Sequence, residues 1–451
     1  MAQLLGHAGF RPVANPNQAG VLLVNTCGFI GPAREESYRV LNELAAHKRG
    51  GQLLIAAGCL TQRYGMEVAQ RVPGIDGLLG TRRWMDIVDV VTQLRRTKHP
   101  EPLYHLPTEA LTVGTDEHEA LRVSVQGASA YIKIADGCRR PCAFCAIPLI
   151  KGTAVSRPVD AILTEARALR DRGVRELILI AQDSTDYGHD LGMKEGLSTL
   201  LEELVRAVPD VDWVRIMYAF PGYVTDRMIE TMATHKQLIP YLDMPLQHAH
   251  PMALRRMRRP ANMDWVRETL ANMRTAMPEL SLRTTFIVGY PGETDEEFQT
   301  LLDFVQETRF DRVGAFQFSF EPGTTSEPLG DPVPAEVKQA RYEQLMELQQ
   351  PISLEKNQAW VGKTLNVLVE GQGKVEGSDG VATGEPISIG RSYRDAPEID
   401  GVVLIEGEVP TGEMVPVRIT GAMTYDLVGT VAWEERAGVG GVADQGMISD
   451  A

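Results

Sequence analysis

Apolar runs alternate with helical patterns over the first 98 residues. Val21–Asn25 and Leu53–Ala57 are short, continuous apolar segments, typical of buried strands, and Pro32–Lys48 has the pattern of a helix between them. Strands that alternate with helices indicate βαβ units and a parallel sheet. We therefore predict an α/β domain over residues 1–98, followed by a proline-rich, acidic linker over residues 99–121.

The same alternation continues on a longer scale over residues 122–353. Three helical segments are predicted at Asp160–Arg172, Asn262–Met277 and Asp295–Thr308. Six strands are predicted at Tyr131–Ile134, Glu176–Ala181, Trp213–Met217, Leu242–Leu246, Thr285–Val288 and Ala315–Ser319. This arrangement fits a partial (β/α)6 barrel, in which the chemistry lies at the carboxyl ends of the strands.

The pattern changes after Pro351 to short apolar runs between Gly, Pro and Asp turns. Strands are predicted at Lys363–Glu370, Ala382–Pro386, Val402–Ile405 and Met414–Ile419. Short strands at such spacing predict a small antiparallel β-barrel over residues 357–430. The Gly-rich residues 437–451 are expected to form a flexible tail.

Composition restricts the class of protein and its partners. The chain has 451 residues, 43% of them hydrophobic and 23% charged, as in ordinary globular proteins. It has no apolar run of membrane-spanning length and no secretory signal pattern, so we expect a cytoplasmic protein that does not bind a membrane. Its net charge of −15 argues against a general nucleic-acid binder and suits a basic protein partner. The alternative is that the acidic balance serves only solubility.

Three cysteines in a CxxxCxxC spacing carry the strongest chemical signal. Cys138, Cys142 and Cys145 offer three thiolates, whereas an iron–sulfur cluster is usually held by four. The set therefore indicates a 4Fe-4S cluster with one open iron, which in radical enzymes binds S-adenosylmethionine. A zinc site would want four ligands at a different spacing, and a disulfide framework fits neither the sparse nor the odd cysteine count. We favour the cluster, with zinc or structural cysteines as the alternatives.

The other two cysteines end the two predicted strands of the first domain. Cys27 follows Val21–Asn25, and Cys59 follows Leu53–Ala57. Parallel strands end at one pole of their sheet, so the two thiols are expected to converge there. The alternative is a pair of ordinary buried cysteines, and the matching positions favour ligation of a metal centre.

The segment Tyr131–Pro148, around the cysteine loop, resembles the radical S-adenosylmethionine methylthiotransferases. The resemblance covers about residues 20–430 and implies a C-terminal TRAM domain. It also implies two 4Fe-4S clusters. Cys138, Cys142 and Cys145 would hold the radical-generating cluster, and Cys27 and Cys59 would belong to an auxiliary cluster that takes three cysteines and carries the inserted sulfur.

The resemblance also suggests residues that bind the cofactor. Phe144 matches an aromatic residue whose backbone borders the adenine, and loop packing is its alternative role. Gln182 lies at a strand end from which it could reach the cofactor. Gly289 and Gly292 would let the backbone approach the cofactor, or else form a tight turn between strand and helix. No general acid–base residue is expected, so we nominate no catalytic side chain.

Further motifs resemble one branch of this family. Asn25–Ile30, Ala181–Thr185 and Asp243–His248 look like the bacterial enzymes that methylthiolate an aspartate of small-subunit ribosomal protein uS12. In such enzymes a radical derived from S-adenosylmethionine takes hydrogen from the aspartate β-carbon, sulfur adds there, and a second S-adenosylmethionine supplies the methyl group. We expect an electron donor such as flavodoxin or ferredoxin, with uS12 free or within the ribosome as substrate. The alternative substrate is a modified adenosine of tRNA.

Two departures from the family pattern affect these expectations. The third auxiliary cysteine lies, in the family, in a loop after a first strand, but here Met1–His7 already has the pattern of the helix that follows that loop. We expect the missing strand and cysteine to be encoded upstream of Met1; otherwise the chain would be impaired in sulfur insertion. The predicted barrel has 5 Lys and Arg against 11 Asp and Glu over residues 357–430, which suits a cationic polypeptide better than RNA.

A basic run at Leu254–Pro260 contains four arginines. It could bind phosphate or ribosomal RNA. We favour a solvated helix face with acidic partners nearby.

Overall fold

The computed structural model describes residues 1–96, 101–107, 125–374 and 384–432. The chain divides into two compact units, Met1–Ser353 and Leu354–Ala451. The predicted flexible tail lies outside the described residues, as does most of the predicted linker. The predicted domain boundaries remain predictions.

The first domain of the larger unit is built on a four-stranded parallel sheet. Its strands run in the order β1 (Val21–Thr26), β2 (Leu53–Gly58), β3 (Gly77–Gly80) and β4 (Leu103–His105). The two predicted strands and the predicted helix, α2 (Gly31–Ala46), are confirmed. Strand β3 was not predicted, nor was β4, which lies within the segment expected to be a linker.

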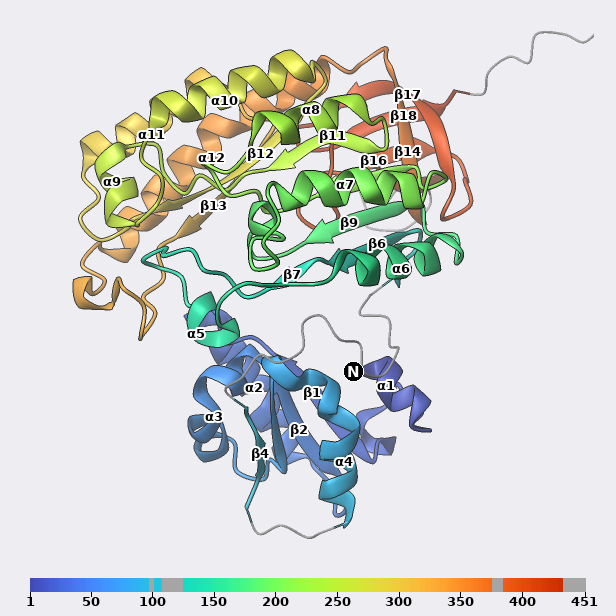
Figure 1. The fold of residues 1–451 in the computed structure, drawn as a ribbon, viewed down its shortest axis with the longest axis vertical. Coiled ribbons are helices and arrows are strands. Elements are labelled where there is room, and N and C mark those ends of the chain that lie inside the picture. The colour runs from blue at the N-terminus through green and yellow to red at the C-terminus, as the bar shows by residue number, and fades with distance from the viewer. Residues whose placement is uncertain (97–100, 108–124, 375–383, 433–451) are drawn as a thin grey trace, which may run out of the picture. The chain divides into compact units, whose positions relative to one another are not determined.

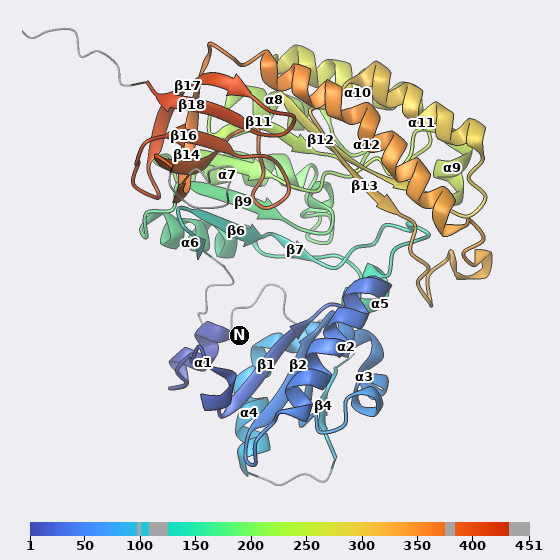
Figure 2. The same cartoon turned by 180° about the vertical axis from the view of Figure 1, so that it is seen from behind.

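Helices cover both faces of this sheet. Ile55 and Ala57 of β2 point to the side of α1 (Ala2–His7) and α4 (Ile87–Arg96). Leu54 and Ala56 point to the side of α2 and α3 (Cys59–Arg71). Because successive side chains of a strand alternate between faces, one apolar run supplies both cores. Figures 1 and 2 show α4 on one side of the sheet and α2 and α3 on the other.

The second domain of the larger unit contains six strands where the sequence predicted six. The predicted strand Leu242–Leu246 was misplaced, because the observed strand is Leu238–Asp243, and the other five predicted strands are confirmed. The six strands form one parallel sheet in the order β13, β12, β11, β10, β9 and β6, and a short antiparallel strand, β5, pairs with β6 at the edge. Their bounds are β5 (Val125–Gln126), β6 (Ser129–Lys133), β9 (Glu176–Ile180), β10 (Trp213–Ile216), β11 (Leu238–Asp243), β12 (Ser281–Val288) and β13 (Arg312–Gln317). This is the predicted partial barrel.

Helices between these strands pack on the sheet and complete one large apolar core. The three predicted helices are confirmed as α6 (Val159–Arg170), α10 (Met263–Ala276) and α11 (Asp295–Thr308). Helix α11 begins with a capping box, in which Thr294 and Glu297 each accept a hydrogen bond from the other's backbone amide. The remaining helices are α5 (Ile147–Lys151), α7 (Gly196–Ala207), α8 (Asp226–Thr234), α9 (Pro251–Arg256) and α12 (Ala335–Gln358). Short 3-10 helices lie at Pro16–Gln18, Thr81–Asp86, Ser184–Asp186 and Glu327–Leu329, and a small β7 (Ala135–Asp136)–β8 (Val155–Ser156) pair flanks the cysteine loop.

The smaller unit contains a closed five-stranded barrel, as predicted, although one of its strand pairs is parallel and only the other four are antiparallel. Its strands are β14 (Thr364–Lys374), β15 (Pro386–Ser392), β16 (Val403–Glu406), β17 (Met414–Ala422) and β18 (Leu427–Val431). The predicted strand Ala382–Pro386 was misplaced: residues 382 and 383 lie outside the described residues, and β15 begins only at Pro386. Proline fits the first position of a strand, and Ile387 and Ile389 then alternate with small residues in the pairs that β15 makes with β14 and β16. Strand β18 was not predicted.

Candidate radical cluster site

The cysteine loop leaves the sheet through a turn that requires glycine. Gly137 has φ of 79°, and a Cβ at this position would collide with the backbone oxygen of Thr153. The Cys138 amide then donates to the Gly152 carbonyl at 3.1 Å. The first cysteine is therefore fixed against the far end of its own loop.

The middle of the loop is held by two other segments of the domain. The Ala143 amide donates to the carbonyl of Met257, just after α9, at 2.9 Å. The Ala143 carbonyl accepts from the Ser326 amide, also at 2.9 Å. These bonds fix the backbone between the second and third cysteines, although the partners are far away in the sequence.

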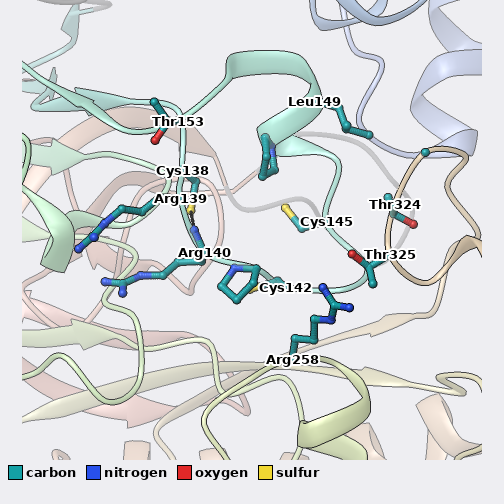
Figure 3. A pocket seen from close by; sticks show the side chains of 13 residues that line it. Cys138, Arg139, Arg140, Cys142, Cys145, Leu149, Thr153, Arg258, Thr324 and Thr325 are labelled. Atoms are coloured by element: carbon teal, nitrogen blue, oxygen red, sulfur yellow. Dashed lines mark hydrogen bonds between the residues drawn. The ribbon is translucent and has the colours of Figure 1, made fainter.

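All three thiols line one cavity of about 430 Å³. Figure 3 shows the cavity with Arg258, Thr324 and Thr325 on the side opposite Thr153. The described residues contain no group of three His, Cys, Asp or Glu arranged to hold a metal ion. A 4Fe-4S cluster does not need its ligands gathered around a single ion, because each thiolate binds a different iron of the cluster. Three thiols around a shared cavity suit such a cluster, with one iron left without a protein thiolate.

Each of the three sulfur atoms accepts one N–H hydrogen bond. The Arg140 amide donates to Cys138 Sγ at 3.4 Å, and the Ile147 amide donates to Cys145 Sγ at 3.5 Å. The third donor is a side chain: Arg259 Nη1 lies 3.6 Å from Cys142 Sγ. Donors of this kind stabilise the negative charge that thiolates carry when they bind iron.

Burial keeps two of these thiols protonated until a metal binds. It raises the pKa of Cys138 to about 11 and the pKa of Cys145 to about 12, although the amide hydrogen bonds from Arg140 and Ile147 lower both values. Iron must therefore displace protons from these thiols when it binds.

Two arginines of the loop are neutralised by aspartates that follow β9. Arg139 Nε lies 2.7 Å from Asp186 Oδ2, and Arg140 Nε lies 2.5 Å from Asp183 Oδ2. The Arg140 guanidinium also lies 3.5 Å from the ring centroid of Tyr223. These contacts fix the loop, and the two positive charges are balanced locally.

The other two cysteines converge as expected. Cys27 follows β1 and Cys59 follows β2, and the last residues of the two strands, Thr26 and Gly58, are paired in register. Burial raises the pKa of the Cys59 thiol, Lys151 of α5 lowers it, and Cys27 raises it further, so both groups lie within electrostatic reach of Cys59. Ligation of an auxiliary cluster by this pair remains a prediction.

Comparisons with known proteins agree with this geometry. The chain matches the family models of the radical SAM superfamily over residues 132–305, the TRAM domain over 361–432 and the uncharacterized protein family UPF0004 over 1–80. It is 49% identical to the ribosomal protein uS12 methylthiotransferase RimO of Chloroflexus aurantiacus, over 95% of both chains. The chain belongs to the RimO family. The RimO of Roseiflexus sp. is 48% identical, with 95% of this chain and 93% of that one covered.

A solved structure shows the same fold at low identity. It is the radical S-adenosylmethionine methyltransferase TsrM from Kitasatospora setae, with a TM-score of 0.53 and 14% identity. The match covers 72% of this chain and 66% of that chain. As a radical SAM member of the RimO family, this chain is a methylthiotransferase whose cofactors include a 4Fe-4S cluster and S-adenosylmethionine.

The structure gives the expected cofactor-binding residues different surroundings. Phe144 is half-buried and packs against Met257, Tyr290 and Phe318, which is the packing role considered as its alternative. Gln182 follows β9, and its Oε1 is buried without a hydrogen-bond partner among the described residues. That oxygen can therefore accept a hydrogen bond from a bound molecule.

Gly289 lies in a tight turn, the alternative role considered for it. It has φ of 72°, its amide donates to Glu293 Oε2 at 2.7 Å, and a Cβ would collide with the side chain of Lys338. Gly292 also has positive φ, 79°. Contact of Gly289 with the cofactor remains a prediction.

The arginine run does not form one solvated face. Arg256 pairs with Glu297, as the favoured interpretation expected, but Arg258 lines the cysteine cavity and Arg259 is buried beside Cys142. The run lies at the end of α9, and consecutive side chains point to different neighbours where the helix stops.

Glu321, which follows β13, is a further residue that the sequence did not single out, and it contacts the loop that carries Cys27. Its Oε2 accepts from Arg63 Nη1 at 2.8 Å, and its Oε1 accepts from the Gly31 amide at 2.7 Å. Arg63 also donates to the carbonyl of Gly28 at 3.0 Å. Glu321 thus links the loop that carries Cys27 to the domain that carries the CxxxCxxC loop.

Proposed function

We propose that this chain transfers a methylthio group to the β-carbon of an aspartate in ribosomal protein uS12 by radical SAM chemistry. The observation that carries the proposal is the match to RimO proteins over 95% of the chain. The three thiols around one cavity support it, because the radical chemistry of the family needs such a set.

In this proposal Cys138, Cys142 and Cys145 hold the 4Fe-4S cluster. When bound there, the cluster supplies the electron for reductive cleavage of S-adenosylmethionine. The protein fixes the loop through the backbone bonds of Ala143, and Gln182 Oε1 is available to a donor of the cofactor. Phe144 packs behind the loop and keeps its backbone in place for the adenine.

The inserted sulfur is held, in this proposal, at the pair Cys27 and Cys59. Convergence of the two thiols at the ends of β1 and β2 supports a shared role. Two thiolates do not complete the three-cysteine set of the family's auxiliary cluster, so iron content decides how sulfur is carried. Two clusters per chain after anaerobic reconstitution would support an auxiliary cluster, and one would contradict it.

The basic substrate would be attracted by the acidic barrel of the smaller unit. Glu385, Glu406 and Glu408 are exposed, whereas two of the barrel's arginines, Arg391 and Arg394, are buried. Asp395 is buried as well, and Arg391 pairs with Glu370, so the described part of the barrel keeps the acidic balance of its composition. Such a surface favours a cationic polypeptide over the phosphates of RNA.

An electron donor such as flavodoxin or ferredoxin and a cytoplasmic site of action belong to the same proposal. In the part of the chain that the structure describes, no helix has both the length and the apolar character needed to cross a bilayer.

The substrate assignment is tested in a strain that lacks the gene for this chain. The strain is complemented with the wild type, with Cys142→Ser, or with Arg255→Met, which changes an exposed residue outside the cavity. Mass spectrometry should find methylthiolated uS12 with the wild type and Arg255→Met but not with Cys142→Ser. If tRNA digests, and not uS12, lose the methylthio group in the deletion strain, the proposal is wrong.

The barrel's role is tested with the full chain. Glu406→Lys combined with Glu408→Lys should weaken binding of uS12 several-fold at low salt and less at high salt, because exposed charges act through screened attraction. Glu268→Lys, an exposed change on α10, is the control. Equal loss in the two variants would contradict a specific role for the barrel.

A further inference from the structure

We infer that Arg259 is a positioning residue that sets the reduction potential of the cluster bound by Cys138, Cys142 and Cys145. The inference rests on the proposed function only in requiring that this cluster assembles. It assigns a task to one arginine of the run that the sequence suggested was a solvated helix face.

The first argument is the pattern of donors to sulfur. Cys138 and Cys145 each accept an N–H from the backbone two residues ahead. Cys142 accepts from Arg259 Nη1, which is 117 residues away in the sequence. Arg259 therefore does for the middle sulfur what backbone amides do for the other two, and it does so with a formal positive charge.

The second argument is that this guanidinium is held in place. Arg259 is 8% exposed, its Nη2 donates to the carbonyl of Pro245, and its guanidinium lies 4.0 Å from the ring centroid of Phe220. Its backbone amide donates to the Leu254 carbonyl at 2.8 Å. A fixed donor keeps its effect on the sulfur, whereas a mobile surface arginine would be screened by water.

The third argument is charge balance. Arg139 and Arg140, on the same loop as the thiols, are each neutralised by an aspartate. Within the described ranges Arg259 has no ion pair with a carboxylate, so its charge acts on the sulfur beside it.

The consequence follows from electrostatics. Reduction adds an electron and makes the cluster more negative, so a buried cation and an N–H···S bond stabilise the reduced form more than the oxidised form. Arg259 should therefore raise the reduction potential and ease electron transfer from the donor. Removing it should make the cluster harder to reduce.

The test is an EPR-monitored redox titration of the anaerobically reconstituted full chain. We expect Arg259→Met to lower the equilibrium constant for reduction at least tenfold, a shift of about 59 mV to more negative potential for one electron. Arg259→Lys, which keeps a charge but not the planar fork, should lie between it and the wild type. Arg255→Met, an exposed change four residues earlier, should titrate like the wild type.

The possible outcomes separate this inference from the proposed function. If the wild type takes up no cluster, the proposed function fails. If it does and Arg259→Met titrates like the wild type, or Arg255→Met shifts as far, the inference is overturned. Should Arg259→Met not fold, Arg259→Lys is compared with the wild type by pulsed EPR after 15N labelling of arginine side chains. The inference is supported if the wild type shows a 15N coupling to the reduced cluster that is absent from Arg259→Lys. It is overturned if the two spectra show the same coupling.

Discussion

Replacement of Glu321 by alanine should release the loop that carries Cys27. The Glu321 side chain is 2% exposed and that of Arg63 is 5% exposed, so this is a buried ion pair with a contact of 2.8 Å. Arg34 Nη1 adds a longer contact to the same oxygen at 3.4 Å. Removing one partner of a buried pair typically costs about 3–5 kcal/mol, because the remaining charge stays buried without compensation.

The Gly31 amide reports this loss directly, because it donates to Glu321 Oε1. Its exchange with solvent deuterium is therefore measured by mass spectrometry on peptides from residues 27–34 of the full chain. At about 1.4 kcal/mol per tenfold change, the loss corresponds to exchange roughly two to three and a half decades faster, up to the limit set by global unfolding. Glu321→Gln should have a smaller effect, since its amide oxygen can still accept from Gly31.

The control is Glu327→Ala. Glu327 is exposed on the segment that follows Glu321, and its side chain accepts from the Gly323 amide at 2.9 Å. It should leave exchange at residues 27–34 within about threefold of the wild type, as expected for a surface change of at most about 0.5 kcal/mol. The double variant with Arg63→Met should recover part of the loss, because it removes the stranded charge. If the amides of residues 27–34 exchange at the wild-type rate in Glu321→Ala, Glu321 does not hold this loop.

Three further predictions concern the central domain. Gly289→Ala should destabilise the chain by about 1–2 kcal/mol for its positive φ alone, and by more for the collision with Lys338, measured by urea denaturation; an unchanged midpoint would contradict the turn's strain. Burial raises the pKa of Glu297, but the hydrogen bonds from Arg256 and from the Thr294 amide, together with the charges of Arg256 and His250, lower it by more, so that the pKa lies below its ordinary value of 4.5. Its contribution to stability is therefore complete above pH 4.5 and lost as pH falls through the lowered pKa, so Glu297→Gln should cost stability at pH 7 and converge with the wild type in acid. Cys142→Ser should abolish the visible and EPR signals of the reconstituted cluster yet leave the far-UV circular dichroism of the chain unchanged; retained iron at this site would contradict ligation.

The predicted strand at Glu176–Ile180 is an apolar run because both of its faces are buried. Leu177 and Leu179 belong to the core beneath the helices, and Ile178 is buried on the other face of the sheet. Strand β3, Gly77–Gly80, was missed because four residues with glycine at each end carry no periodicity. Strand β15 was misplaced because the predicted strand ends at Pro386, whereas the pairing with β14 begins there.

In the site, too, the features set by neighbouring residues were predictable, and those that depend on residues far away in the sequence were not. The three thiols were predictable, since their spacing lies within eight residues of sequence. The partners that tune and fix them were not: Arg259 acts on a cysteine 117 residues away, and Glu321 acts on an arginine 258 residues away. Only the fold brings such pairs together, and neither residue type carries a signal at its own position.

The arginine run shows why a cluster of charge in sequence need not be one in space. Helix α9 has only six residues, and the Met257 amide bonds to the Ala253 carbonyl as the helix ends. Beyond that point the backbone turns, with φ of 53° at Arg258, so neighbouring side chains no longer share a helix face. Arg256 pairs with Glu297 of α11. Arg258 lines the cysteine cavity, and Arg259 donates a hydrogen bond to Cys142 Sγ. A charge run at the end of a short helix therefore predicts several separate contacts, and each has to be examined against its own neighbours.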